Sequence, residues 1–227
     1  KHAQILGGGD VKGARLVAVC DIVAERAETL GAKHAVPHFT DLHAMMDAHG
    51  GDVDVICILT ESGLHAEHTI ACFEKGLHVY CEKEMSNNLD DAKKMVLAGR
   101  KAGKLLQIGH QRRSNPRYIY CYEKLFKEAN LLNRVTNISG QWHRSRSASE
   151  DLGWPKGTDI PVETLKKFGF KDMPQFRNWR SCKGLGGGPA VGLGSPHTHS
   201  NRWFLDHTPP PSVIAPRSCR SRPQHAW

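Results

Sequence analysis

Apolar runs alternate with helix-like segments over the first half of the chain. Four continuous apolar runs are each typical of a buried strand: residues 15–20, 54–59, 77–81 and 105–109. Segments rich in helix-forming residues precede or separate them: residues 1–6, 24–30, 41–48, 65–75 and 89–102. Thr40 is placed to cap the third of these helices, and Gly76 and Gly103 follow the last two. Because continuous apolar strands separated by helices are parallel and covered on both faces, the pattern predicts a doubly wound parallel sheet in an α/β domain.

The alternation of apolar strands and helices ends after residue 111. This change predicts a boundary between a first domain at 1–111 and a second domain at 112–208. In the second domain we expect helices at 116–129 and 162–168 and a third helix that ends at 203–205. We also expect a strand with one solvent-exposed face at 134–142, a loop at 145–158 and a glycine-rich turn at 184–188. Residues 209–227 are rich in Pro, Arg and Ser without periodicity, and we expect a disordered tail there.

Composition narrows the class of protein. Hydrophobic residues make up 39% of the 227 residues, charged residues 24%, and no run approaches the roughly 20 apolar residues of a membrane span. The seven cysteines form no C-x-x-C pair and read as buried apolar side chains, so we expect a reducing, cytoplasmic setting and no metal site. An upstream export signal is left open, because the chain does not begin with Met.

The net charge of +8 results from 31 Lys and Arg against 23 Asp and Glu, with the excess late in the chain. No aromatic-interleaved basic strand or recognition helix accompanies it, so we expect a solvated face and contacts with anionic ligands, and neither nucleic acid nor membrane as a partner.

Polar residues that follow the predicted strands are the candidates for chemistry, because open α/β sheets bind ligands at the carboxyl ends of their strands. Asp21 ends the first strand, where an acidic residue accepts hydrogen bonds from the adenosine ribose and disfavours a 2′-phosphate, as in NAD binding. A helix N-cap is the alternative role, and the two are compatible. Thr60 and His65 follow the second strand as a helix cap or first-turn residue, or as cofactor contacts.

Glu82 and Lys83 follow the third strand and form the most informative stretch. A lysine beside a substrate hydroxyl or carbonyl can donate a proton or hydrogen bond while hydride moves to or from a nicotinamide. The alternative is a solvated charge run. Residues 7–9, three consecutive glycines, follow a helix and precede a strand, so we read them as a connecting loop and not as a phosphate loop.

Ordered motifs in the chain resemble the glucose–fructose oxidoreductase/inositol dehydrogenase/MocA family. They are Thr60 to His65, Glu82 to Met85, and residues 108–113 with the sequence I-G-H-Q-R-R, and the similarity extends from residue 1 to about 215. The E-K-P signature of the family reads E-K-E here, as in a subgroup with C-E-K-E-M-S.

The resemblance implies NAD or NADP binding by the first domain, a second α+β domain with a mainly antiparallel sheet, and a sugar, inositol or related polyol as substrate. It implies homo-oligomers, as is common in the family. By motif match, the residues that would line the cofactor are Asp21, Thr60, His65, Glu82, Lys83, Gln111, Arg112, Trp179 and Arg180. Lys83 would also lie near the substrate.

The sequence departs from the family pattern in two places. The first strand and the G-x-G-x-x-G loop of family members have no counterpart, so we expect an incomplete Rossmann-type sheet and weak NAD binding. In the later element G-G-G-P-x-x-D-L-G-x-H-x-x-D, the first Asp corresponds to Gly192, the His to Pro196 and the last Asp to His199. His197 lies one place late and is the candidate acid/base histidine, with a loop histidine as the alternative.

Three functions remain open from the sequence. The first is reversible hydride transfer at a secondary alcohol or carbonyl of a sugar-like substrate. The second is NAD-dependent glycoside cleavage on the same fold. The third is a catalytically inactive, truncated product.

Overall fold

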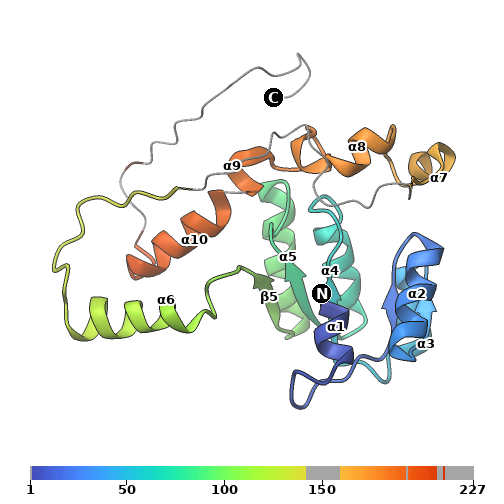
Figure 1. Ribbon diagram of the computed structural model, residues 1–227, viewed down its shortest axis with the longest axis horizontal. Helices are drawn as coiled ribbons and strands as arrows, with labels where there is room; N and C mark the ends of the chain where they lie inside the picture. Colours follow the sequence, from blue (N-terminus) through green and yellow to red (C-terminus); the bar gives the residue numbers. More distant parts are fainter. Residues whose placement is uncertain (1, 142–158, 193, 209–211, 213–227) are drawn as a thin grey trace. The chain divides into compact units, whose positions relative to one another are not determined.

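The computed structural model describes residues 2–141, 159–192, 194–208 and 212 (Figure 1). In the first half, strands and helices alternate in the order α1 (His2–Gly7), β1 (Val19–Cys20), α2 (Ala24–His34), β2 (His38–Phe39), α3 (Leu42–His49), β3 (Val55–Ile58), α4 (His65–Glu74), β4 (His78–Glu82), α5 (Leu89–Ala102) and β5 (Leu106–Gly109). The predicted alternation of strands and helices is therefore confirmed.

The second half of the described chain contains helices. They are α6 (Pro116–Tyr120), the π-helix η1 (Cys121–Glu128), α7 (Val162–Lys167), α8 (Met173–Arg177), the 3-10 helix η2 (Trp179–Ser181), α9 (Gly188–Gly192) and α10 (Gly194–Phe204). The helix predicted over 116–129 is present as α6 continued by η1. The helix expected to end at 203–205 is α10.

The strands form two hydrogen-bonded groups. β1 and β2 pair in parallel, with Val19 opposite His38 and Cys20 opposite Phe39. The other group has the order β3-β4-β5, and a helix joins each strand to the next, as parallel neighbours require. The parallel α/β class is thus confirmed. The short β2 was not predicted, because two residues are too few to show a periodicity.

Local sequence explains most element ends. The Asp41 carboxylate accepts a hydrogen bond from the Ala44 N–H at 2.7 Å, so Asp41, and not the predicted Thr40, caps α3. Gly76 and Gly103 have φ of +73° and +64°, the left-handed conformation in which glycine ends α4 and α5 as predicted.

The strand predicted over 134–142 is wrong for the part that the structure describes. Residues 135–141 have no regular secondary structure, and Ile138 is 37% exposed. No strand in the described part of 112–208 pairs with this segment, and an alternating pattern without a hydrogen-bonding partner does not form a sheet. The expected antiparallel sheet is likewise absent from the described residues of this region. The predicted loop at 145–158 and, apart from residue 212, the predicted tail at 209–227 lie outside the described residues.

The described chain divides into two compact units, which are considered separately. The first contains Lys1–Ile58, Glu67–Tyr80 and Lys93–Gln107, and the second contains Leu59–Ala66, Cys81–Ala92 and the chain from Ile108 onward. The second unit therefore includes the loops that follow β3, β4 and β5. The boundary predicted near residue 111 stays a prediction.

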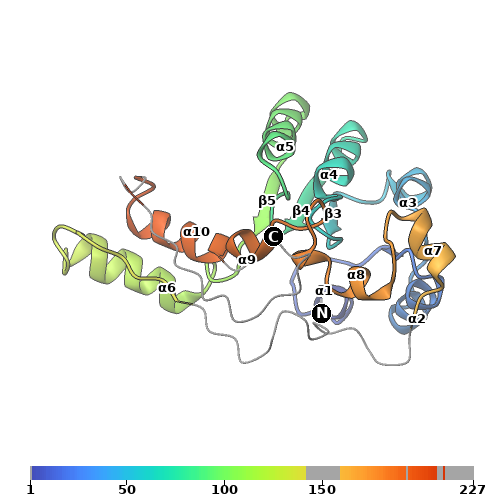
Figure 2. The ribbon, with the colours of Figure 1, turned by 90° about the horizontal axis from the view of Figure 1, so that it is seen from above.

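The core of the first unit lies where α4 and α5 run beside the strands (Figures 1 and 2). Met95 of α5 is completely buried, and Phe73 of α4 and Val79 of β4 are 3% and 2% exposed. Gly99 lets α5 approach α4 closely, since a Cβ there would lie 3.2 Å from the Phe73 ring. Within the described part of the chain, no helix is long and apolar enough to cross a membrane.

An aromatic cluster joins η1 to α10 in the second unit. The ring centroids of Tyr122 and Trp203 lie 5.0 Å apart, and those of Phe126 and Phe204 also 5.0 Å apart. The Tyr122 hydroxyl donates to the Asp206 carboxylate at 2.7 Å. These contacts hold α10 alongside the α6–η1 helix (Figures 1 and 2).

Met95→Ala is expected to lower the free energy of unfolding by about 2–5 kcal/mol, because it leaves a cavity in a fully buried position of α5. Leu97→Ala, two residues along the same helix at a side chain 62% exposed, is the matched control and is expected to change it by less than about 0.5 kcal/mol. Urea denaturation followed by circular dichroism measures both. Equal losses in the two variants would contradict the described core.

Candidate active site

The loops after β3, β4 and β5 carry most of the polar candidates, and all three belong to the second unit. Carboxyl ends of parallel neighbours meet at one edge of a sheet, where α/β proteins bind ligands. The structure thus brings together residues that are separated in the sequence. It also adds the glycine-rich segment 184–192 and helix α10 to them.

His65 connects two of these loops. Its ring is 1% exposed, with Nδ1 2.5 Å from the Glu84 carbonyl oxygen and Nε2 3.0 Å from the Thr60 carbonyl oxygen. Burial lowers the pKa of His65, while the two carbonyls and the charge of Glu82 act in the opposite direction. A neutral imidazole has a single N–H, so in that form one of the two carbonyls receives a hydrogen bond. His65 therefore positions the loops, and its direct contact with a cofactor stays a prediction.

Hydrogen bonds from a lysine and an asparagine side chain attach the loop after β4 to the glycine-rich segment. The Lys83 ammonium donates to the Gly192 carbonyl oxygen at the end of α9. The Asn87 amide donates to the carbonyl oxygens of Gly184 and Leu185 at 2.9 and 3.4 Å. A segment about 100 residues further along the chain thereby fixes the lysine that the sequence singled out.

Glu84 lies buried against the same segment. Its side chain is 4% exposed, and burial raises the pKa of its carboxyl, opposed by the charges of Lys83 and Arg180 and by the Gly187 N–H. A Cβ on Gly192 would lie 2.8 Å from Glu84 Oε1. A side chain at position 192 would therefore require the Glu84 carboxyl to move.

Two histidines stack beside this loop. His110 follows β5 directly, and His199 lies on α10; their ring centroids are 4.2 Å apart with an interplanar angle of 4°. Burial, the charge of His199 and the charge of Lys83 lower the pKa of His110 to about 4. Burial and the charges of Arg113, His207 and Arg202 lower the pKa of His199. Both rings are therefore neutral near pH 7.

The other site residues predicted in the second unit have the following neighbours. His197 lies beside Gly140, since a Cβ there would be 3.6 Å from His197 Cγ. The Arg112 guanidinium donates to the Tyr118 hydroxyl, and the Arg180 guanidinium lies 4.3 Å from the centroid of the Trp179 ring. Gln111 is exposed and Glu82 is half-buried. Arg180 thus lies in the electrostatic environment of Glu84, whereas Arg112 contacts the first turn of α6.

Asp21 lies in the first unit at the end of β1. Its Oδ1 accepts a hydrogen bond from the Val23 N–H at 3.0 Å, and Oδ2 lies 3.8 Å from Arg26 Nε. Asp21 is therefore not the N-cap of α2, which is Val23, and its carboxylate instead binds the amide of that capping residue. The long ion pair and a side chain 25% exposed leave Oδ2 able to accept from a ribose hydroxyl, so the residue fits an adenosine dinucleotide.

The glycines at 7–9 end α1, as predicted for a connecting loop. The Gly8 N–H donates to the Gln4 carbonyl at 2.9 Å and the Asp10 N–H to the Ile5 carbonyl at 3.3 Å. These amides close the helix end, and Gly9 has φ of +77°. They are not arranged to hold a phosphate.

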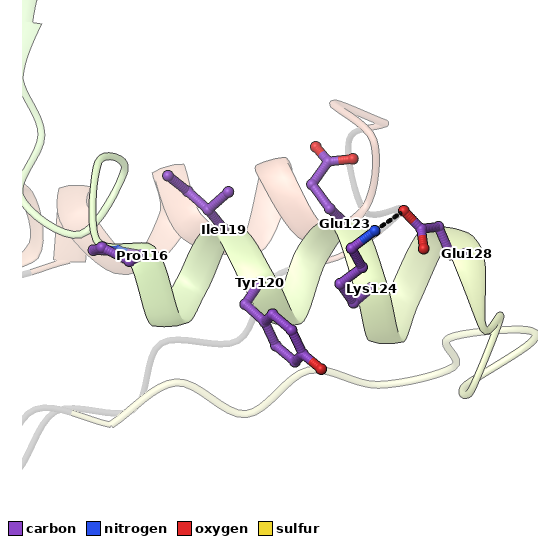
Figure 3. A pocket seen from close by; sticks show the side chains of 6 residues that line it. All are labelled: Pro116, Ile119, Tyr120, Glu123, Lys124 and Glu128. Atoms are coloured by element: carbon purple, nitrogen blue, oxygen red, sulfur yellow. Dashed lines mark hydrogen bonds and ion pairs between the residues drawn. The ribbon is translucent and has the colours of Figure 1, made fainter.

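A separate hollow of about 510 Å³ runs along one face of α6 and η1 (Figure 3). It is lined by Pro116, Ile119, Tyr120, Glu123, Lys124 and Glu128, and Lys124 and Glu128 form an ion pair along the helix, one turn apart, at 2.5 Å. It contains none of the predicted site residues. Among the described residues, no group of three or more His, Cys, Asp or Glu side chains is arranged to hold a metal ion.

Three residues of the site, Glu84, His110 and His199, were quoted within the family motifs but not proposed as site residues. Position after a strand was a usable signal for Glu84 and His110, since both follow the carboxyl ends of strands as Lys83 does. His199 was noted as the residue in place of the motif's last Asp, but only the packing of α10 shows that it meets His110.

The chain is similar to known proteins in sequence and in fold. Residues 7–110 match the model of an oxidoreductase family described as having an NAD-binding Rossmann fold. The inositol 2-dehydrogenase 3 of Saccharopolyspora erythraea is 35% identical over 192 residues, which cover 73% of this chain and 55% of that protein. The 4-carboxy-2-hydroxymuconate-6-semialdehyde dehydrogenase of a Sphingobium strain is 31% identical over 126 residues, covering 55% of this chain and 39% of that protein. The chain thus spans about half or less of the length of the curated relatives it matches.

Solved structures share the fold over most of the chain. An NAD-binding protein from Listeria innocua superposes with a TM-score of 0.66 at 20% identity, covering 90% of this chain and 51% of that one. The WlbA dehydrogenase from Bordetella pertussis, solved with NADH and UDP-GlcNAcA, gives 0.60 at 24% identity, covering 90% and 55%.

The predicted resemblance is therefore confirmed by the family model, by relatives in sequence and by the shared fold. The chain belongs to the glucose–fructose oxidoreductase/inositol dehydrogenase/MocA family of oxidoreductases, and residues 7–110 are its NAD-binding Rossmann part.

Proposed function

We propose that this chain is part of an NAD(P)-dependent oxidoreductase that acts on a sugar, inositol or related polyol by hydride transfer at a secondary alcohol or carbonyl. The observation that carries the proposal is Lys83, which follows β4 with its ammonium fixed to the Gly192 carbonyl beside the stacked histidines. Several relatives in sequence are named for related activities, among them inositol 2-dehydrogenase and 1,5-anhydro-D-fructose reductase.

The chemistry of the site supports this class of reaction. The nicotinamide, when bound, supplies the acceptor or donor of hydride. Lys83 would hydrogen-bond the substrate oxygen that changes between hydroxyl and carbonyl, and a positive charge there stabilises an alkoxide-like transition state. His65 would hold the loops that carry Thr60 and Glu82 beside the nicotinamide, and Gln111, Arg112, Trp179 and Arg180 would complete its surroundings.

We propose NAD as the preferred cofactor. Asp21 would accept hydrogen bonds from the adenosine ribose, and its charge would repel a 2′-phosphate. Arg26, 3.8 Å from Asp21, would partly offset that repulsion. The preference therefore depends on one carboxylate and is open to a direct test.

A polyol as substrate, a homo-oligomer and a cytoplasmic location complete the proposal. The free thiols of the described cysteines support a reducing compartment. The motif register predicts His197 as the acid/base histidine, and that role stays a prediction.

A dehydrogenase assay on the 227-residue chain tests the function. NADH formation is followed with inositols, aldoses and their acids, alongside the same chain extended by a strand and a G-x-G-x-x-G loop. Turnover of at least one polyol by either protein is expected. The extended protein should bind NAD more tightly, because the loop amides hold the pyrophosphate. Absence of turnover and of NAD binding in both would refute the proposal.

Lys83→Gln is expected to lower kcat at least about 10²-fold, because the substrate oxygen loses its charged hydrogen-bond donor. The affinity for NAD, measured by titration calorimetry, should change much less. Lys171→Gln removes a positive charge from an exposed position of the same unit and serves as the matched control with unchanged kcat. An equal effect of the two substitutions would contradict the role of Lys83.

Asp21→Asn is expected to raise the affinity for NADP relative to NAD by about tenfold, or about 1.4 kcal/mol, because the amide oxygen still accepts from the Val23 N–H but the charge is lost. Titration calorimetry with both dinucleotides measures the ratio. Asp47→Asn, at an exposed carboxylate paired with Lys75, should leave the ratio unchanged. An unchanged ratio in Asp21→Asn would exclude Asp21 as the selecting residue.

A further inference from the structure

The stacked pair of His110 and His199 is the feature that the motif-based assignment does not explain. The rings are parallel within 4° at a centroid distance of 4.2 Å. His110 lies at the carboxyl end of β5, and His199 approaches from α10, 89 residues later in the chain. Parallel stacking at this distance joins the sheet edge to the helix that follows Gly192, the residue that holds Lys83.

Each ring of the pair has one nitrogen without a protein partner. Nδ1 of His110 and Nε2 of His199 are buried, and no described residue forms a hydrogen bond with either atom. Buried polar atoms are usually satisfied, and an orphaned one at a sheet edge where ligands bind is a candidate for contact with a ligand. The hydroxyl of a polyol satisfies such a nitrogen lone pair by donating to it.

The charges around the pair select the neutral imidazole. His110 faces the ammonium of Lys83 and the ring of His199, and both oppose its protonation, as burial does. His199 in turn faces Arg113, Arg202 and His207. A neutral ring has the free lone pair that can accept a proton, so His110 is in the accepting form at neutral pH, while the same surroundings make it a weaker base than a free imidazole.

The position of His197 on the same helix separates it from this pair. Residues two apart on an α-helix point to roughly opposite sides, about 200° around the axis. His199 packs on His110, and His197 lies by Gly140. The helix therefore brings His199 to His110, directly after β5, and places His197 beside Gly140.

We propose that His110 is the catalytic base that takes the proton of the substrate hydroxyl, and that His199 is the positioning residue that holds its ring. The inference rests on the proposed oxidoreductase function and assigns the acid/base role to a pair other than His197. In the oxidation, the hydride of the carbinol C–H passes to the oxidised nicotinamide of NAD(P)⁺. The hydroxyl proton passes to Nδ1 of His110, and the C–O single bond becomes the carbonyl. Reduction reverses each step.

An NMR titration of the histidine Cε1–H groups in the chain without cofactor tests the pair directly. His110 is expected to titrate near pH 4, well below an ordinary histidine. His199→Phe keeps an aromatic ring in the stack but removes its charge, so it should raise the pKa of His110. His197→Gln should leave that pKa in place. The proposed pairing of His110 with His199 would be refuted if His110 titrated near pH 6.5, or if its pKa changed equally in both variants.

Steady-state kinetics with the polyol turned over by the wild type test the chemical role. His110→Gln is expected to lower kcat about 10²-fold or more with a smaller change in KM. In His199→Phe the acid limb of kcat/KM should move to higher pH, because the rate depends on neutral His110 and its pKa has risen. His197→Gln should cost less than His110→Gln, and Thr198→Ala, at an exposed position of α10, is the neutral control.

The outcomes separate the two proposals. If the wild type turns over a polyol while His110→Gln retains its rate, or His197→Gln is the more damaging variant, the assignment of His110 falls and the oxidoreductase function stands. If the wild type turns over no polyol and binds no dinucleotide, the proposed function falls, and the catalytic role of His110 falls with it.

Discussion

The candidate site depends on the attachment of the loop after β4 to the glycine-rich segment 184–192. Lys83 alone, on an exposed loop, would be a mobile cation of the kind that charge runs usually present to solvent. Its donation to the Gly192 carbonyl, together with the bonds from Asn87 to Gly184 and Leu185, places the ammonium and limits its motion. A preorganised charge at a sheet edge stabilises developing negative charge far better than a solvated one.

Buried ionisable groups surround that attachment, and the pKa of each is shifted toward the neutral form. Glu84 is buried with a raised pKa, and His65, His110 and His199 have lowered pKa values, so burial favours the neutral form of each. Lys83, Arg180 and Glu82 are the charged side chains that act on these buried groups. A site of this kind is suited to hold a neutral polyol and to move a single proton, because the neutral histidine accepts it while the ammonium faces the oxygen.

The glycines and the aromatic residues of the second half support this arrangement. Gly186 lies where a Cβ would be 2.7 Å from the Arg180 backbone, and Gly192 lies against Glu84. A larger residue at position 186 would clash with the Arg180 backbone, and one at position 192 would displace the Glu84 carboxyl. Arg113, 4.2 Å over the Trp203 ring, and the contacts of Tyr122 hold α10 in place, and with it His199. The packing of the second unit thus determines the geometry of its chemistry.

The sequence by itself determined the α/β class and the positions of most strands and helices, and it made Lys83 a candidate, because periodicity and the carboxyl-end rule are local properties of the chain. It also identified the family through ordered motifs. Only the tertiary structure decided that Asp41 caps α3, that residues 135–141 form no strand, and that His199 meets His110. A helix cap depends on the direction of one side chain, and a strand depends on a hydrogen-bonding partner. A stacked pair depends on how a distant helix packs. The neighbouring residues in the sequence determine none of these.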